Sequence, residues 1–346
     1  MGTETKSQTT TAQKFQALIL DIFFGIYFVV TLHRVFYYQV LLSLRKLPPV
    51  TVEIVLLYIG IGSILGLALF VLNVSPGKRI FRQLPDIPWK KAVAEHFLWI
   101  IGVLTIATGW VVTRVSILDF FSQEGLAGAK RIFSALLSPE WSILPQALLA
   151  IVETIYLALM ATLFALPVAF ILSFFTARNL MRQSPITLSI YTVLRVLVNF
   201  TRSIEPLIWA IIFTVWVGIG PFAGTLALMV HTIASLTKLY SEQIENVDPG
   251  PIEAIEATGA HPMQVIWFAV VPQIVLPFLS FTIYRWDINV RMATIIGLVG
   301  GGGIGTLLMQ YQGLAQWHEV GLLVLIIAIV VWIMDYLSAR IREALV

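Results

Sequence analysis

The residues best suited to hold an anion form one polar block within a long apolar run. The block is Tyr284–Arg291, with three charged side chains and an asparagine. Asp287 and Arg291 are four residues apart, so a helix places them on one face in the favourable acid-before-base order. Arg285 and Asn289 repeat this spacing on a neighbouring face. Charges in an apolar run are costly, and they usually face a bundle interior or a wet cavity.

Two interpretations of this block stay open. Asp287 and Arg291 could form an ion pair that only fixes helix packing. Arg285 has no acidic residue four positions away, so it is the better candidate to contact an anion. A guanidinium can hold two oxygens of an oxyanion at once. Asp287 would weaken such binding, and a transport pathway needs weak, transient contacts.

Other charged residues in apolar runs give weaker signals. Arg202 and Glu205, three residues apart, could form a helical pair or latch a gate, and Arg202 is a further pathway candidate. His231 is interpreted as a hydrogen-bonded packing residue, and the histidines show no metal-ligand spacing, so no metal site or catalytic residue is predicted. Most of the single acids at or near the ends of apolar runs are expected to reach the interface by snorkelling: the five are Asp21, Glu53, Glu95, Glu153 and Asp335.

The elements that carry these residues are membrane spans. Of the 346 residues 58% are hydrophobic and 12% charged, and the mean hydropathy is +0.88. A span needs about 20 apolar residues. We therefore predict an all-α polytopic membrane protein with about eight transmembrane helices and no affinity for nucleic acid. The predicted spans are Phe15–Tyr38, Val52–Val74, Val93–Val115, Leu144–Thr176, Val196–Val217, Phe222–Tyr240, Gln273–Leu298 and Val320–Leu337.

Lysine and arginine set the predicted orientation. With both termini cytoplasmic, twelve basic residues fall in inner segments and four in outer ones, as the positive-inside rule favours. The polar segment 1–16 is then a cytoplasmic tail, because it has no signal-peptide pattern. Residues 116–141 become an outer connection with an amphipathic segment. Cysteine is absent, which excludes disulfides and cysteine nucleophiles.

A polar island, Asp248–Pro262, lies on the predicted cytoplasmic side. Asp248 or Gly250 can cap a short helix, and a proline suits its first turn. Gly259 can adopt the left-handed conformation that ends a helix, and Pro262 can begin the next one. The sequence predicts two helices joined by a tight turn, either as a docking surface or as an ordinary cytoplasmic loop.

The spacing in this island resembles the EAA motif of ABC importer permeases. Glu253, Ala254, Gly259 and Pro272 match the motif, while Ile255, Ala269 and Val271 are apolar exchanges. In that family the segment forms coupling helices, here 249–268, that sit in a groove of the cytoplasmic ATPase. The resemblance implies ATPase-coupling roles for six residues: Glu253, Ala254, Glu256, Gly259, Ala260 and Pro262.

Further blocks are similar to the permease of phosphonate-type ABC importers. They include Ala177-Arg178-Asn179, Gly218–Gly224, Lys238–Glu242, Tyr284–Arg291 and Gly297–Gly305. The resemblance runs from about Trp110 to the C-terminus. It implies a type I core of five helices at 146–346, preceded by an extension at 17–145 with three spans.

The glycine run Gly300, Gly301, Gly302 and Gly303 lacks the Lys-Ser/Thr of a P-loop, so nucleotide binding is rejected. It is either a flexible helix end or an irregular segment lining a cavity, which membrane proteins tolerate only under cover of protein or water. The resemblance favours the second and places the run at the outer mouth of a pathway.

The resemblance implies a permease subunit that works as a homodimer in the bacterial inner membrane. Two partner ATPases would bind ATP and Mg, this chain would bind no cofactor, and an extracytoplasmic phosphonate-binding protein would deliver phosphonate, phosphite or phosphate. The chain has no ATPase motif, so it is not expected to be an enzyme itself. The alternative is an ion-coupled secondary transporter of a small anion, which predicts two related halves that the sequence does not show.

Overall fold

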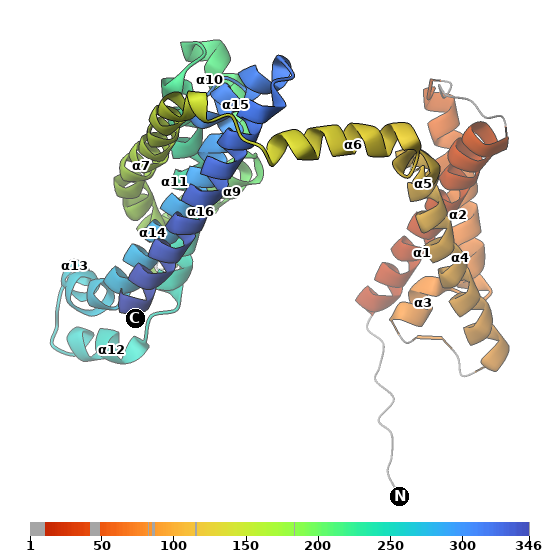
Figure 1. The fold of residues 1–346 in the computed structure, drawn as a ribbon. Coiled ribbons are helices and arrows are strands. Elements are labelled where there is room, and N and C mark those ends of the chain that lie inside the picture. Colours follow the sequence, from red (N-terminus) through yellow and green to blue (C-terminus); the bar gives the residue numbers. More distant parts are fainter. Residues whose placement is uncertain are drawn as a thin grey trace, which may run out of the picture. The chain divides into compact units, whose positions relative to one another are not determined.

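The computed structural model describes residues 11–41, 49–81, 83–84, 87–114, 116–182 and 184–345, and these ranges contain helices and turns without a strand. Contacts divide the chain into two units, Met1–Gly125 and Leu126–Val346 (Figure 1). The predicted boundary near residue 145, with three spans before it and five after it, stays a prediction.

The first unit packs two apolar helices closely together. Small residues let helix backbones approach in a membrane, and here Gly62 and Gly66 of one helix face its neighbour: a Cβ on Gly66 would lie 2.5 Å from the carbonyl oxygen of Asp21. The elements are α1 (Thr11–Thr31), a π-helical segment (Leu32–Leu41), α2 (Val52–Val71), α3 (Pro76–Ile80), α4 (Pro88–Thr113) and α5 (Ile117–Phe120).

The second unit is a helical bundle in which α7 packs along α11 and α14. Figure 1 shows α12 and α13 at one end of this bundle and α10 and α15 at the other. The elements are α6 (Gln123–Leu136), a 3-10 turn (Trp141–Ile143), α7 (Leu144–Phe175), α8 (Arg178–Met181), α9 (Pro185–Ser203), α10 (Pro206–Val217), α11 (Pro221–Glu245), α12 (Pro249–Glu256), α13 (Pro262–Val265), a π-helical turn (Ile266–Val270), α14 (Val271–Gly297), α15 (Gly303–Gly313) and α16 (Trp317–Leu345).

Seven helical segments in the described residues are long and apolar enough to span a membrane, or eight if the bent pair α9–α10 is one span. The predicted continuous span Val196–Val217 is wrong, because α9 and α10 meet at 90°. Ile204 between them is extended, with φ −90° and ψ 120°. Pro206 opens α10 without an N–H to continue the helical ladder, so the chain turns there.

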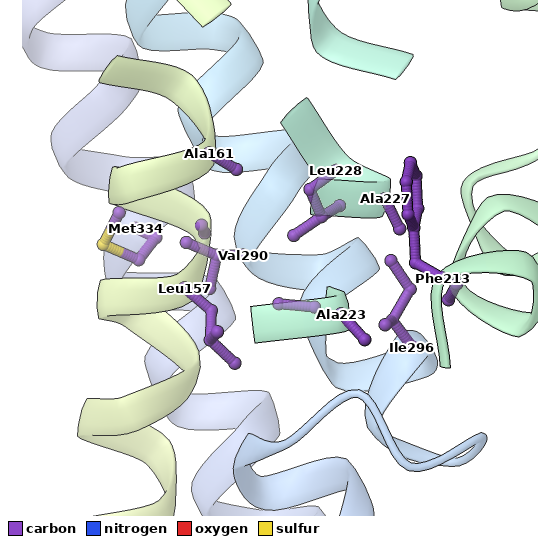
Figure 2. Close-up of a cluster of buried hydrophobic side chains, with 12 residues drawn as sticks. Leu157, Ala161, Phe213, Ala223, Ala227, Leu228, Val290, Ile296 and Met334 are labelled. Atoms are coloured by element: carbon purple, nitrogen blue, oxygen red, sulfur yellow. The ribbon is translucent and has the colours of Figure 1, made fainter. Parts of the chain in front are cut away.

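The core of the bundle depends on small residues of α7. Ala158 and Ala161 have no exposed surface, and they lie in one buried cluster with Leu228 of α11 and Val290 of α14 (Figure 2). A run of alanines lets α11 approach α7 closely while larger side chains fill the neighbouring spaces. This packing fixes the rotation of α14 and hence the direction of its polar side chains.

Candidate functional site

The polar island folds as a helical hairpin, defined here as residues 248–265. The Asp248 carboxylate caps α12 by accepting the Gly250 N–H at 3.0 Å. Gly259 lies in the turn that follows α12 and has φ +79°, the left-handed conformation that the sequence predicts for it. His261 and Gln264 then cap α13 reciprocally, with the His261 N–H donated to Oε1 of Gln264 at 2.8 Å.

Two contacts hold the hairpin against the bundle. Ile252 of α12 packs on a buried cluster that includes Tyr240 and Ile274. Gln273, in the first turn of α14, accepts the Asp248 N–H at 3.0 Å through Oε1. Its Nε2 donates to the carbonyl oxygen of Ala269 at 2.8 Å. Gln273 therefore connects the hairpin to a membrane helix, a role that no spacing in the sequence indicates.

The outer face of the hairpin is free in the single chain. Of the six residues assigned to coupling, only Ala260 is half-buried and the other five are exposed. Beyond the turn, Met263 and Trp267 are exposed by 69% and 65%. Exposed large apolar side chains that lie together mark candidate sites of protein contact. This surface can dock a partner.

A buried polar cluster, defined as Thr162, Thr232, Arg285 and Asn289, joins α7, α11 and α14. Asn289 has no exposed surface. Its Nδ2 donates to Oγ1 of Thr162 and to Oγ1 of Thr232, both at 2.9 Å. Paired polar groups are the condition under which such residues can be buried, so Asn289 fixes three helices at one level of the bundle.

Arg285 belongs to the same cluster but is incompletely paired. Its side chain is 8% exposed, and Nε donates to Oγ1 of Thr232 over a long 3.5 Å. Among the described residues, Nη2 has no hydrogen-bond partner. A buried guanidinium with a free donor is able to receive an anion oxygen.

Asp287 and Arg291 form the ion pair that their spacing predicts. Nη2 of Arg291 lies 2.6 Å from Oδ2 of Asp287, and the same nitrogen also pairs with Asp335 of α16. Asp287 is buried while the other two side chains are 42% and 49% exposed. Arg291 thus links α14 to α16, and its charge is already balanced by two carboxylates. The sequence could not reveal Asp335 as the third member, because it lies 44 residues away.

Arg202 and Glu205 lie on opposite sides of the break between α9 and α10. Arg202 is in the last turn of α9, and Glu205 precedes the first residue of α10. A pair across one helical turn is therefore wrong for these two residues. His231 of α11 lies 3.1 Å, through Nδ1, from the carbonyl oxygen of Ile204, so it is a hydrogen-bonded packing residue at the break.

Two side chains of α7 accept hydrogen bonds from the backbone at the end of the glycine run. Glu153 Oε1 accepts the Gly303 N–H at 3.2 Å, and Thr154 Oγ1 accepts the Ile304 N–H at 2.8 Å. A Cβ on Gly303 would lie only 2.4 Å from Thr154 Oγ1, and its φ is +70°. The run is therefore irregular, as predicted, and Gly301–Gly303 are buried. Glu153 does not snorkel, because it binds this backbone.

Asp21 also departs from the expected snorkelling. It has no exposed surface, and its carboxylate accepts the hydroxyl of Ser75 and, at 2.7 Å, the N–H of Gly77. Ser75 in turn caps α3. Glu95 pairs with Arg79. These acids hold loops in place, and the contacts join residues more than fifteen positions apart, where a sequence pattern gives no signal.

Comparison with known proteins places this fold and hairpin in a family. The model for the "binding-protein-dependent transport system inner membrane component" matches residues 169–346. The phosphite transport system permease protein PtxC of Stutzerimonas stutzeri is 34% identical over 263 residues, which are 76% of this chain and 90% of that protein. The phosphate-import permease protein PhnE of Mycolicibacterium smegmatis is 29% identical over 75% of this chain and 48% of its own length.

A solved structure agrees in fold. The inward-facing MetNI methionine ABC transporter has a chain that superposes with a TM-score of 0.53 at 21% identity, over 60% of this chain and 99% of that chain. This protein is therefore of the class of all-helical, multi-pass inner-membrane permeases with the type I ABC importer fold. The chain belongs to the family of binding-protein-dependent transport system inner membrane components.

Membership in this family favours the importer permease over the ion-coupled secondary transporter. The sequence-based prediction of a phosphonate-type ABC importer permease is confirmed at the level of the family and its fold. The roles of the individual coupling, pathway and outer-loop residues stay predictions, to which the contacts above add geometry.

Proposed function

We propose that this chain is the membrane subunit of an importer for a small phosphorus oxyanion, namely phosphonate, phosphite or phosphate. The observation that carries the proposal is the exposed hairpin fixed to α14 through Gln273. The functions of two relatives, phosphite transport by PtxC and phosphate import by PhnE, support the class of substrate.

The proposed assembly contains two copies of the chain, two cytoplasmic ATPases and an extracytoplasmic binding protein. ATP and Mg bind to the ATPases, and the assembled complex hydrolyses ATP while this chain contributes no catalytic group or cofactor. The hairpin and both termini face the cytoplasm. The twelve-to-four distribution of basic residues supports this orientation.

In the proposed mechanism, the hairpin docks in a groove of the ATPase. The contact is made by the exposed Glu253, Ala254 and Glu256 on α12 and, around the turn, by the exposed Gly259 and Pro262 and the half-buried Ala260. Movement of the ATPases shifts α12, and Gln273 transmits this shift to α14 because it is a residue of α14 that bonds the hairpin at Asp248. The polar block near the middle of α14 then changes its position in the bundle.

The proposed pathway passes the polar residues of α14 and the break between α9 and α10. Arg285 is the main anion contact because, among the described residues, its Nη2 has no partner, and Arg285 and Asn289 both bond the Thr232 hydroxyl. Arg202 adds positive charge at the break. Asp287 and Arg291 tune the local charge, since Arg291 is shared with Asp335. Gly300–Gly303 form the outer mouth.

Reconstitution tests the proposal. The chain and its partner ATPase are placed in liposomes, and the binding protein is added. Uptake of labelled phosphite, methylphosphonate and phosphate is measured with ATP supplied either inside or outside. We expect uptake only with ATP and the binding protein present. Concentrative uptake by the chain alone, driven by a proton or sodium gradient, would instead establish a secondary transporter.

A further inference from the structure

An open pocket of about 250 Å³ lies at the end of the bundle where α11 leads into α12. It is lined by Arg178, Asn179, Arg182 and Glu245. Asn179 shapes it by donating from Nδ2 to the carbonyl oxygen of Ile244 at 2.8 Å, which satisfies the end of α11. The pocket is separate from the polar block of α14 and from the outer face of the hairpin.

The charge of this pocket is positive. Glu245, its one acid, is already neutralised: Oε1 accepts Nη1 of Arg195 at 2.6 Å and the backbone N–H of Arg178 at 2.8 Å. Arg178 and Arg182 are exposed, and neither guanidinium forms an ion pair with a described residue. Two arginines therefore remain free to bind an anion in a pocket whose carboxylate is compensated.

The surroundings of the pocket are apolar and face outward. Phe175, at the end of α7, is 44% exposed, and Ile186, in the first turn of α9, is 72% exposed. Along the chain, α7 ends three residues before Arg178 and α9 begins three residues after Arg182, so a molecule with a charged head and hydrocarbon chains would meet arginines and apolar side chains together. Basic pockets between helices at this level of a membrane bind anionic headgroups.

We propose that Arg178 and Arg182 bind the phosphate of an anionic phospholipid. The lipid headgroup occupies the pocket, and its acyl chains run along the exposed apolar faces of α7 and α9. A planar guanidinium can bind two phosphate oxygens at once. Glu245 and Asn179 fix the end of α11, four residues before α12 begins. A bound lipid therefore also stabilises the segment that leads into the hairpin. The assignment to the inner leaflet rests on the proposed function, whereas lipid binding itself does not.

The test measures lipid affinity of the purified full chain in detergent by native mass spectrometry. Phosphatidylglycerol and phosphatidylcholine with the same acyl chains are titrated against the wild type, Arg178→Gln/Arg182→Gln and Arg178→Lys/Arg182→Lys. Arg340→Gln is the matched control, because Arg340 is exposed on α16 and pairs with Glu343. We expect about 25-fold weaker phosphatidylglycerol binding in the glutamine variant, at about fivefold per arginine, and partial recovery with lysine.

Three results would overturn the proposal. Equal phosphatidylglycerol affinity in the glutamine variant and the wild type would remove the pocket from lipid binding. Competition by inorganic phosphate at concentrations close to those of the lipid would assign the pocket to a free anion. Loss of ATPase association with unchanged lipid affinity would assign the arginines to a protein contact. Unchanged helical circular dichroism and elution volume ensure that each variant is folded.

Discussion

The Gln273 side chain accepts the backbone N–H of Asp248 at 3.0 Å, across 25 residues of chain. This bond joins the two ends of the segment that leaves the bundle before α12 and re-enters it at the start of α14. The hairpin is therefore a rigid projection at its base, while its tip carries no buried residue in α12. A force applied to the tip can reach the membrane helices through this base.

Gln273→Ala should uncouple the two activities of the complex. The substitution removes the acceptor for Asp248 and the donor to Ala269, at a cost of about 1 kcal/mol for each net hydrogen bond. We expect ATP hydrolysis to continue while substrate uptake per ATP falls about fivefold, measured together in proteoliposomes. Gln312→Ala, an exposed change on α15, is the control and should leave the ratio unchanged; an unchanged ratio in both variants would contradict the role of Gln273.

Gly259→Val should disturb the turn of the hairpin. The φ of +79° is left-handed, and a β-branched residue there costs about 1–3 kcal/mol. We expect loss of coupled uptake with normal insertion in the membrane, measured by transport and by co-purification of the ATPase. Asparagine tolerates this conformation, so the Gly259→Asn variant should retain most uptake. Normal transport by the valine variant would count against the hairpin as the coupling element.

Arg285→Ala should reduce uptake without releasing the ATPase. The unpaired Nη2 is the group that we expect to meet the substrate, so uptake at limiting substrate should fall about tenfold, corresponding to about 1.4 kcal/mol. Arg285→Lys keeps the charge and should recover part of the rate. If uptake by the alanine variant equals that of the wild type at limiting substrate, Arg285 is a packing residue only.

Thr154→Val should destabilise the bundle by about 1–3 kcal/mol, because the buried N–H of Ile304 loses its acceptor. Thermal unfolding of the purified chain in detergent measures this loss. Thr225→Val is the control: among the described residues its hydroxyl bonds only the Pro221 carbonyl of its own helix, and we expect a change below about 0.5 kcal/mol. Similar thermal unfolding midpoints for the two variants would show that the Thr154 hydroxyl of α7 contributes little to the stability of the bundle.

The sequence predicts those features that depend on local pattern. Apolar runs mark the long helices, and the turn at Gly259 follows from residue types within one short segment. The Asp287–Arg291 pair is also local, since four residues bring the two side chains together on any helix. Each of these predictions needs no knowledge of which helices are neighbours.

The features that the sequence does not predict depend on contacts between different helices or on the local backbone conformation. Asp335, Glu153 and Thr232 reach their partners from other helices, and nothing in the spacing of one helix indicates a second. The bend at Ile204 is not predicted for a different reason: mean hydropathy over 20 residues is insensitive to two extended residues, Ile204 and Glu205, before Pro206. Partner chains would complete a further set of contacts that a single sequence does not reveal.

The π-helical turn at Ile266–Val270 sets the angular phase between the hairpin and the polar block. Such a turn holds one residue more than an α-helical turn, and each residue advances a helix by about 100°. Deleting one residue there would swing the side chain of Arg285 about a quarter of a circle away from Thr232 if the hairpin stayed in place. The length of this segment is consequently as constrained as the identity of its residues, and insertions should be tolerated elsewhere in the chain before they are tolerated here.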